Sequence, residues 1–206
     1  MVLLVGNSKR IWEPFTEHLR AATEEVGQNP LDAFVEAKIG ESLDETLREA
    51  AGISSVGVVA PPMVFFSQRK YSAFAGSYLP IQRLAAASGL AVLSQDCHMC
   101  LHAVYGPWFS LRGVLIFKEV KMKGGPSISP GLTQDVISEE GKRQLKAQCD
   151  KAVRSLGQEA TQEWIELRRM ASRLAGIDKR CWYSDEQISY HYGLNREALV
   201  ADIKGA

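Results

Sequence analysis

The chain has 206 residues, of which 46% are hydrophobic and 23% are charged. A chain of this size buries about 70% of its unfolded surface, so its core needs no metal or disulfide to hold it together. The composition is that of a globular protein and excludes a disordered or fibrous one. Its 24 basic and 24 acidic side chains cancel, which argues against a general nucleic-acid binder, because such proteins neutralise many phosphates.

The sequence shows no membrane or secretion pattern. The longest apolar stretch, 56–66, is interrupted by Gly57 and the Pro61-Pro62 pair and is shorter than the ~20 residues of a spanning helix. The apolar start at 1–5 is too short for the core of a signal peptide. The four cysteines are too few and too unevenly spaced for a secreted disulfide framework. We therefore expect a cytoplasmic protein that binds neither membranes nor nucleic acid.

The charges are distributed unevenly along the chain. Residues 1–50 carry 5 basic and 10 acidic side chains, residues 51–130 carry 7 and 2, and residues 131–206 carry 12 of each. A central region with so few carboxylates suits an anionic ligand. It equally suits a neutral or basic sheet beside acidic helices, and composition does not separate these two interpretations.

The first half of the chain alternates between strand and helix patterns. The predicted elements, in chain order, are a buried strand at 2–5 ended by a turn at 6–8, a helix at 12–26, a helix from residue 30 that Gly40 ends or kinks, a helical stretch at 43–50, and strands around the prolines at 56–66. Asn29 and Pro30 make a good N-cap and first residue for the second helix.

The second half begins with strands and ends in helices. The predicted elements are a helix at 81–87 closed by Gly89, a short buried strand at 90–93, a strand at 108–117, and apolar helical stripes at 145–156 and 164–174. Alternation along the strand at 108–117 places Arg112 on the same face as Trp108 and Val114. The Ser184-Asp185-Glu186-Gln187 capping box opens a short last helix.

Strands separated by helices, followed by a helical last third, predict a layered α+β or α/β domain. The Gly-, Pro- and Ser-rich segment 118–132 is the best internal boundary. We therefore divide the chain into a core at 1–117, a connecting loop at 118–132 and a helical part at 133–206 that completes the same domain.

Reactive side chains are densest at Cys97-His98-Met99-Cys100-Leu101-His102. A Cys-x-x-Cys pair forms half of a zinc site, but no second pair follows at the expected spacing. A redox pair normally opens a helix, where the dipole lowers the pKa of the thiol, whereas these cysteines lie between two predicted strands. Zinc, a redox pair and unpaired thiols all stay open as interpretations, and the pattern favours unpaired thiols.

Arg112 interrupts an otherwise apolar strand. A guanidinium buried without a partner is costly, so Arg112 needs an anion. That anion is either a carboxylate from the acidic first third of the chain or an oxyanion on a ligand, and periodicity does not decide between them. The chain has no glycine-rich phosphate loop, no Gly-x-Ser-x-Gly elbow and no His-Glu-x-x-His motif, which disfavours nucleoside triphosphatases and hydrolases.

Four segments, in the right order, resemble the cyanocobalamin reductase and alkylcobalamin dealkylase family (the CblC, or MMACHC, type). They are Asn29-Pro30-Leu31-Asp32 with Glu41-Ser42-Leu43, Ser88-Gly89-Leu90-Ala91 with Gln95, His102-Ala103-Val104-Tyr105-Gly106-Pro107-Trp108-Phe109-Ser110-Leu111-Arg112-Gly113, and Tyr183-Ser184-Asp185-Glu186-Gln187-Ile188-Ser189-Tyr190 with Arg196. The third is the most specific and is similar to the family's His-Pro-x-Phe-Gly-Gly-Trp-Phe-x-Ile-Arg-Gly strand. The resemblance covers most of the chain.

This resemblance implies a nitroreductase-like α+β scaffold with a central, mainly antiparallel sheet flanked by helices. It implies a cytoplasmic protein that binds cobalamin (vitamin B12) base-off and removes the upper axial ligand. Cyanide leaves with electrons from a reduced flavin, FMN or FAD, and alkyl groups pass to a thiol such as glutathione. The implied partners are a flavin reductase or a cobalamin-trafficking protein, and the implied state is a monomer or homodimer.

The resemblance also implies roles for individual residues. Those expected to contact cobalamin are Gln95, His102, Tyr105, Trp108, Arg112 and Tyr183. Arg112 and Arg196 are the catalytic candidates, because they are expected to hold the carboxylates of the thiol. Arg169 and Arg173 are both candidates for a further thiol-binding arginine. No residue is assigned to a metal.

The sequence departs from the family at two places. Ala103 stands where the family motif has proline, and the segment 95–101 is shorter than the hairpin of the animal members and carries the cysteine pair. A weaker similarity links the same strand to epoxyqueuosine reductases and reductive dehalogenases, but the iron–sulfur cysteine runs of those enzymes do not follow here. Two other functions stay open: a carrier that holds cobalamin without turnover, and a nitroreductase-like flavoenzyme with another substrate.

Overall fold

The computed structural model describes residues 1–23, 27–52, 60–66, 79–120 and 137–205. The predicted strand material at 56–66 is therefore described only from residue 60. Most of the predicted loop at 118–132 lies outside the described residues. Among the helices that the structure describes, none combines the length and the apolarity needed to cross a bilayer.

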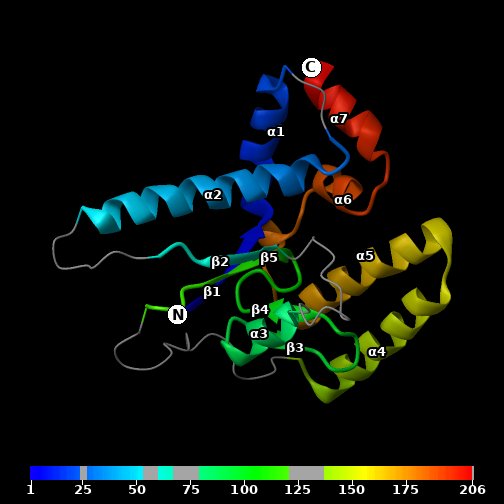
Figure 1. Cartoon of the computed structure of the whole chain (residues 1–206). Coiled ribbons are helices and arrows are strands. Elements are labelled where there is room, and N and C mark those ends of the chain that lie inside the picture. Colours follow the sequence, from blue (N-terminus) through cyan, green and yellow to red (C-terminus); the bar gives the residue numbers. More distant parts are fainter. Residues whose placement is uncertain (24–26, 53–59, 67–78, 121–136, 206) are drawn as a thin grey trace.

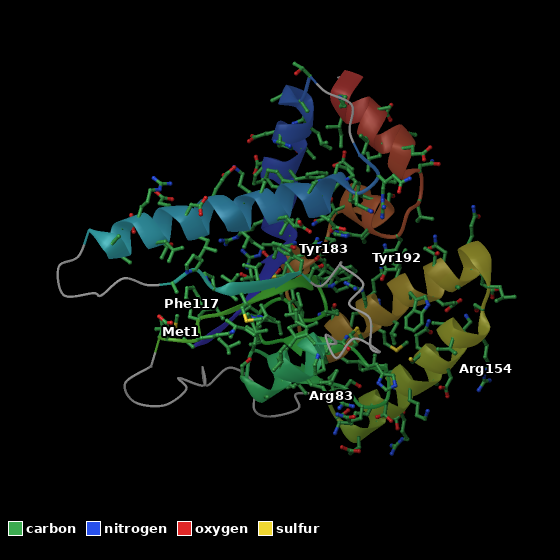
Figure 2. The ribbon with its side chains drawn as sticks, in the orientation of Figure 1. Met1, Arg83, Phe117, Arg154, Tyr183 and Tyr192 are labelled. Carbon is green, nitrogen blue, oxygen red and sulfur yellow. The ribbon has the colours of Figure 1, made fainter. Side chains whose placement is uncertain are left out.

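A three-stranded antiparallel sheet lies at the centre, in the order β1–β5–β2 (Figure 1). The middle strand is β5 (Phe109–Ile116), which pairs with β1 (Val2–Ser8) along one edge and β2 (Met63–Phe66) along the other. The amino group of Met1 donates to the carbonyl of Phe117 at 2.8 Å and so closes the end of the β1–β5 pair (Figure 2).

The predicted turn at 6–8 is wrong, because β1 continues through these residues and pairs with Phe109–Leu111. The register shifts between Val5 and Gly6, which marks a β-bulge. A Cβ atom on Gly6 would lie 2.9 Å from the carbonyl oxygen of Ser110, so the close approach of the two strands requires glycine here. Continued pairing carries Asn7 to the neighbourhood of Arg112.

A second, two-stranded antiparallel sheet consists of β3 (Ala91–Leu93) and β4 (Cys100–His102). It is preceded by α3 (Ile81–Ala87), which has the predicted bounds. Gly89 has φ of 71°, as expected for a left-handed residue that ends a helix. The cysteine pair lies in the turn between β3 and β4 and at the start of β4.

The first two helices are α1 (Trp12–Ala21) and α2 (Pro30–Ala51). A break at Gly40 is wrong: α2 runs for 22 residues and merges the two predicted helical stretches. A single interior glycine costs only about 1 kcal/mol, which the many good helix formers around it offset. Only the first turns of α2 are buried, through Leu31, Phe34 and Val35.

The last third of the chain is helical. Its elements are α4 (Glu139–Arg154), α5 (Gly157–Leu174), the 3-10 turn η3 (Lys179–Cys181), α6 (Asp185–His191) and α7 (Arg196–Gly205). The Ser184 hydroxyl accepts from the amide of Gln187 at 3.2 Å, which confirms the predicted cap of α6. The prediction that α6 is the last helix is wrong, because α7 follows it.

Three groups of buried side chains hold these elements together. Trp12, Phe15, Phe34 and Tyr190 lead the first, which joins α1, α2, α6 and α7. The second packs the α4–α5 hairpin onto the β3–β4 turn, and the third joins Trp108 to α5 and α6. In Figure 1 the first helical group lies above the central sheet, and α3, β3 and β4 lie below it. The predicted class, an α+β domain with an antiparallel sheet flanked by helices, is confirmed.

Candidate functional site

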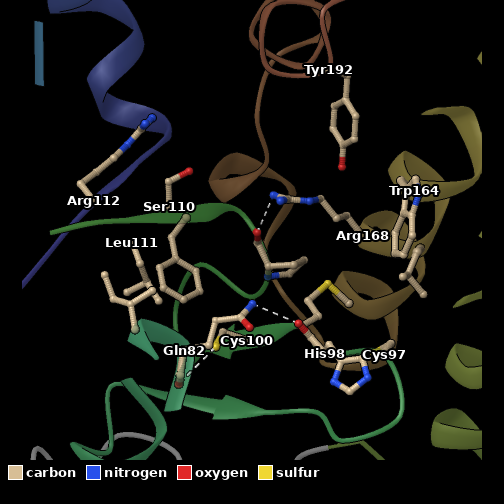
Figure 3. Close-up of a pocket in the computed structure, with 15 residues that line it drawn as sticks. Gln82, Cys97, His98, Cys100, Ser110, Leu111, Arg112, Trp164, Arg168 and Tyr192 are labelled. Atoms are coloured by element: carbon tan, nitrogen blue, oxygen red, sulfur yellow. Dashed lines mark hydrogen bonds between the residues drawn. The ribbon is translucent and has the colours of Figure 1, made fainter. Parts of the chain in front are cut away.

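A cavity of about 610 Å³ lies between β5, α5, α3 and the β3–β4 turn (Figure 3). This volume falls within the range of about 300–1,000 Å³ that small-molecule sites occupy. Its apolar walls come mainly from Phe109, Leu111 and Trp164, and Arg112 and Arg168 are also among its lining residues. None of the described residues that line this cavity is an aspartate or a glutamate.

The β5 wall of the cavity contains Arg112, whose side chain is only 9% exposed. Its Nη1 lies 2.8 Å from Oδ1 of Asp32 on the first turn of α2, and its Nε donates to the side-chain oxygen of Asn7 on β1. Of the two anions that the sequence allows, the structure therefore shows the carboxylate from the acidic first third. The Nη2 atom of Arg112 is buried, and none of the described residues accepts a hydrogen bond from it.

The α5 wall contains Arg168, which sequence reasoning missed. Its Nη1 donates to the carbonyl of Pro107 at 2.9 Å, and its guanidinium carbon lies 5.9 Å from the ring centres of both Trp108 and Tyr192. Arg168 follows Trp164 by one helical turn, and both line the cavity. That spacing could have predicted that Arg168 lies near Trp164. The apolar stripe of α5, which includes Leu167, predicts only which face of the helix is buried.

Trp108 joins the two walls, because it lies just before β5 and packs against α5. Its ring is fully buried, and its Nε1 donates to the hydroxyl of Ser172 at 2.6 Å. It stacks on Trp182 at 5.7 Å and packs against Tyr183 at 5.5 Å between ring centres. Trp108 is thus a core residue here and is not among the residues that line the cavity, so its predicted contact with a ligand stays a prediction.

His102 and Tyr105 form a tight turn behind the cavity. Nδ1 of His102 accepts from the amide of Val104 at 3.0 Å, and the imidazole lies 4.8 Å from the ring of Tyr105 and 5.6 Å from that of Phe109. Burial lowers the pKa of His102. The imidazole therefore supports Phe109, which lines the cavity, and does not line it directly.

The turn is completed by Gly106, which has φ of 54°. A Cβ there would lie 2.7 Å from Cγ1 of Ile177, so both backbone and space demand glycine. The amide of Gly106 donates to the carbonyl of His102 at 2.8 Å, and the amide of His102 donates back at 2.9 Å. Ala103, in place of the family's proline, leaves this turn closed.

The other predicted site residues lie around the cavity rather than in its lining. Gln95 is exposed in the β3–β4 turn. Tyr183 is buried, with its hydroxyl 3.3 Å from that of Ser110. Arg196 opens α7, where its Nε donates to the carbonyl of Tyr190 at 3.1 Å and its guanidinium lies 4.9 Å from the Tyr190 ring. Of the seven predicted residues, Arg112 is the one that lines the cavity, and the roles of all seven stay predictions.

The end of α6 brings further polar groups to this region. His191 stacks on Tyr183 at 5.0 Å between ring centres, and its Nε2 is buried with no hydrogen-bond partner among the described residues. Burial, and after it the positive charges of Arg112, Arg168 and Arg196, lower the pKa of His191 to about 3. The imidazole is therefore neutral at physiological pH and reports a positive potential around the three arginines.

The cysteine pair lines the cavity, and the structure shows free thiols at Cys97 and Cys100. The Cys97 thiol donates to the Ser94 hydroxyl at 3.1 Å, and the Cys100 thiol points to the carbonyl of Gln82 at 3.8 Å. Burial raises the pKa of both, that of Cys100 to about 11. Protonated thiols are poor nucleophiles and poor metal ligands, and no three metal-binding side chains come together in the described parts of the chain.

Comparison with known protein structures identifies the fold of this chain. No family model matches the sequence, and no curated protein sequence matches it. The crystal structure of the Caenorhabditis elegans B12-trafficking protein CblC, a homologue of human MMACHC, is similar over 98% of this chain and 79% of that one, with a TM-score of 0.70 and 17% sequence identity. The chain has the CblC fold. The nitroreductase-like scaffold predicted from the four sequence segments is confirmed with it.

Proposed function

We propose that this protein binds cobalamin base-off and removes its upper axial ligand. The observation that carries the proposal is a cavity with two arginines and no carboxylate among its described lining residues, on the CblC fold. Cobalamin has an anionic phosphodiester in its nucleotide tail, and a thiol such as glutathione has two carboxylates. Both therefore match the sign of the charge in the cavity.

The walls of the cavity suit the body of the ligand. Phe109, Leu111 and Trp164 present apolar side chains to it, and such surfaces give a flat macrocycle broad contact while they exclude water. Excluding water from the lower face of the corrin favours the base-off state. In that state the cobalt is easier to reduce. A reduced flavin can then supply the electron that converts Co(III) to Co(II), and cyanide leaves as the anion.

The thiol reaction needs an anion-binding group beside the cobalamin. Arg112 has Nη2 buried without a partner among the described residues, so a thiol carboxylate can bind there while Asp32 keeps Nη1. Arg196, whose guanidinium carbon lies 4.9 Å from the centre of the Tyr190 ring, is the second arginine that we assign to the thiol. The thiolate sulfur then takes the alkyl group, and the bonding electron pair stays on the cobalt.

The test is a titration of the purified protein with cyanocobalamin, followed by absorbance. We expect a shift to the base-off spectrum, then conversion to cob(II)alamin when reduced flavin is added, and loss of the alkyl group from methylcobalamin when glutathione is added. A base-off shift with neither reaction would make the protein a carrier. Bound yellow flavin with no response to cobalamin would overturn the proposal in favour of a flavoenzyme with another substrate.

A further inference from the structure

We propose that Arg168 on α5 and Tyr192, the residue that follows α6, form a binding subsite for an anionic oxygen group of the ligand (Figure 3). The inference rests on the proposed function for the identity of the ligand. The group bound is either the phosphodiester of cobalamin or a carboxylate of the thiol, since a guanidinium recognises both through the same pair of parallel hydrogen bonds.

Arg168 has no carboxylate partner among the described residues. Its two nearest arginine neighbours on α5 are each paired: Arg169 lies 3.7 Å from Asp185, and Arg173 bonds to Glu166. No described carboxylate lies within ion-pair distance of Arg168, although its side chain lines the cavity. The sequence-based candidates for a further ligand-binding arginine, Arg169 and Arg173, are thus both neutralised within the fold and lie outside the cavity lining.

The Arg168 side chain is held in position while most of its N–H donors have no acceptor among the described residues. The carbonyl of Pro107 accepts from Nη1, the guanidinium carbon lies 5.9 Å from the ring centres of both Trp108 and Tyr192, and the Tyr192 hydroxyl is hydrogen-bonded to the side chain. A guanidinium has five N–H donors, so most of them stay available to a ligand. Because the side chain is already fixed, binding an anion costs little further side-chain entropy.

Tyr192 adds a hydroxyl group beside Arg168. Its hydroxyl points toward Arg168 in Figure 3, and the ring also lines the cavity. Burial raises the pKa of Tyr192, and the nearby positive charge of Arg168 only partly opposes that rise. The hydroxyl therefore keeps its proton at neutral pH and can donate it in a hydrogen bond to the same anion. Arg168 and Tyr192 together supply a charge and a directional donor.

The experiment compares Arg168→Gln with Arg169→Gln, its paired neighbour on α5, in binding of cobalamin and of cobinamide, which lacks the nucleotide tail and its phosphate. A charge-assisted hydrogen bond is worth about 1.5–3 kcal/mol, so its loss weakens binding roughly 10–100-fold. If the phosphodiester is the bound group, Arg168→Gln loses this much for cobalamin and nothing for cobinamide. Arg169→Gln is expected to match the wild type for both.

A second set of measurements, with glutathione, tests whether the bound group is a carboxylate of the thiol. If a carboxylate is the bound group, Arg168→Gln raises the KM for glutathione by a similar factor, and esters of glutathione that lack the carboxylates are unaffected. Either pattern supports the subsite and names its ligand. Equal losses for all ligands, or equal effects of Arg168→Gln and Arg169→Gln, overturn it.

A separate measurement keeps the subsite testable if the proposed function fails. When the wild-type protein shows no cobalamin binding at all, inorganic phosphate serves as the probe, and thermal unfolding is the readout, because a ligand that binds only the folded state raises the melting temperature. We expect phosphate to raise it for the wild type and for Arg169→Gln but not for Arg168→Gln. Absence of the rise in the wild type, or its survival in Arg168→Gln, overturns the subsite.

Discussion

The arginines on the two walls of the cavity differ in burial and in their partners. On β5, Arg112 is almost fully buried, and the fold supplies Asp32 and Asn7 as permanent partners. On α5, Arg168 is partly exposed, and its described contacts are the carbonyl of Pro107, the ring of Trp108, and the ring and hydroxyl of Tyr192. A lone guanidinium deep in a protein is too costly to keep charged, whereas a partly solvated one is tolerated. Burial therefore decides that Asp32 neutralises most of the charge on Arg112 and leaves only its Nη2 without a partner among the described residues, whereas Arg168 keeps most of its donors for a ligand.

The largest effect is expected from Trp108→Ala, which breaks the contact between the two walls. The ring is fully buried, and its Nε1 donates to the Ser172 hydroxyl, so truncation leaves a cavity and removes one of the two hydrogen bonds of that hydroxyl, which still donates to the carbonyl of Arg168. Such changes cost about 3–5 kcal/mol. Urea unfolding measures this, with Val104→Ala as the control, since Val104 is 55% exposed. A loss below about 1 kcal/mol, with a specific loss of cobalamin affinity, would show that Trp108 belongs to the binding surface instead.

The β5 wall is tested by Arg112→Met. The change leaves Asp32 without its cation and the Asn7 carbonyl without its donor, and breaking a buried ion pair costs about 3–5 kcal/mol. Because Asp32 keeps 29% exposure, we expect the lower end, about 3 kcal/mol. Arg143→Gln is the control, since the Arg143–Glu140 pair is exposed and is worth under about 1 kcal/mol.

Adding Asp32→Leu to Arg112→Met sharpens that test. If the ion pair is the source of the loss, the double variant is more stable than Arg112→Met alone, because no unpaired charge is left beside the sheet. If the two changes simply add, the coupling between Asp32 and Arg112 is negligible, and the contrast between the two walls fails.

Local patterns predicted most of the fold. The bounds of α3, the cap of α6 and the strand around Arg112 followed from residue type and spacing alone. Errors arose where long-range contacts outweigh local preference. Gly6, Asn7 and Ser8 are residues typical of a turn, but their pairing with β5 keeps them in β1.

The site was harder to predict than the fold, for a physical reason. The sequence showed that Arg112 needs an anion, but which anion depends on α2 and β5 meeting in space, and 80 residues separate Asp32 from Arg112. The local sequence marks Arg168 only weakly, through its place one helical turn after Trp164. Its importance comes from the absence of a carboxylate near it among the described residues, and only the packing of α5 against β5 reveals that.

A smaller, pH-dependent effect is expected at His191, which feels the charges of both walls. Its folded pKa is about 3, against 6.5 for an unperturbed histidine. The unfolded chain therefore takes up a proton below pH 6.5 that the folded protein refuses, and stability present above that pH is lost as the pH falls toward 3. At pH 5 the loss from this group is about 2 kcal/mol.

The measurement is urea unfolding of the wild type and His191→Phe at pH 7.5 and pH 5. Phenylalanine keeps the stack on Tyr183 but cannot take up the proton, so we expect it to abolish this part of the acid destabilisation. His98→Asn is the control, because His98 is exposed and asparagine tolerates its φ of 51°. Parallel behaviour of His191→Phe and the wild type would mean that the imidazole is not buried in the positive field of the arginines.

The smallest effect on ligand binding is expected from replacing Cys97 and Cys100 together by serine. Both thiols line the cavity, but burial keeps them protonated, and their contacts are to Ser94 and to the backbone of Gln82. Serine preserves these contacts, so cobalamin affinity should stay near that of the wild type while stability falls by about 1–3 kcal/mol for two buried hydroxyls. Absorbance titration and urea unfolding separate the two quantities. A large loss of affinity at unchanged stability would place a thiol on the cobalt or on a metal, and the charge contrast between the walls would then no longer account for binding.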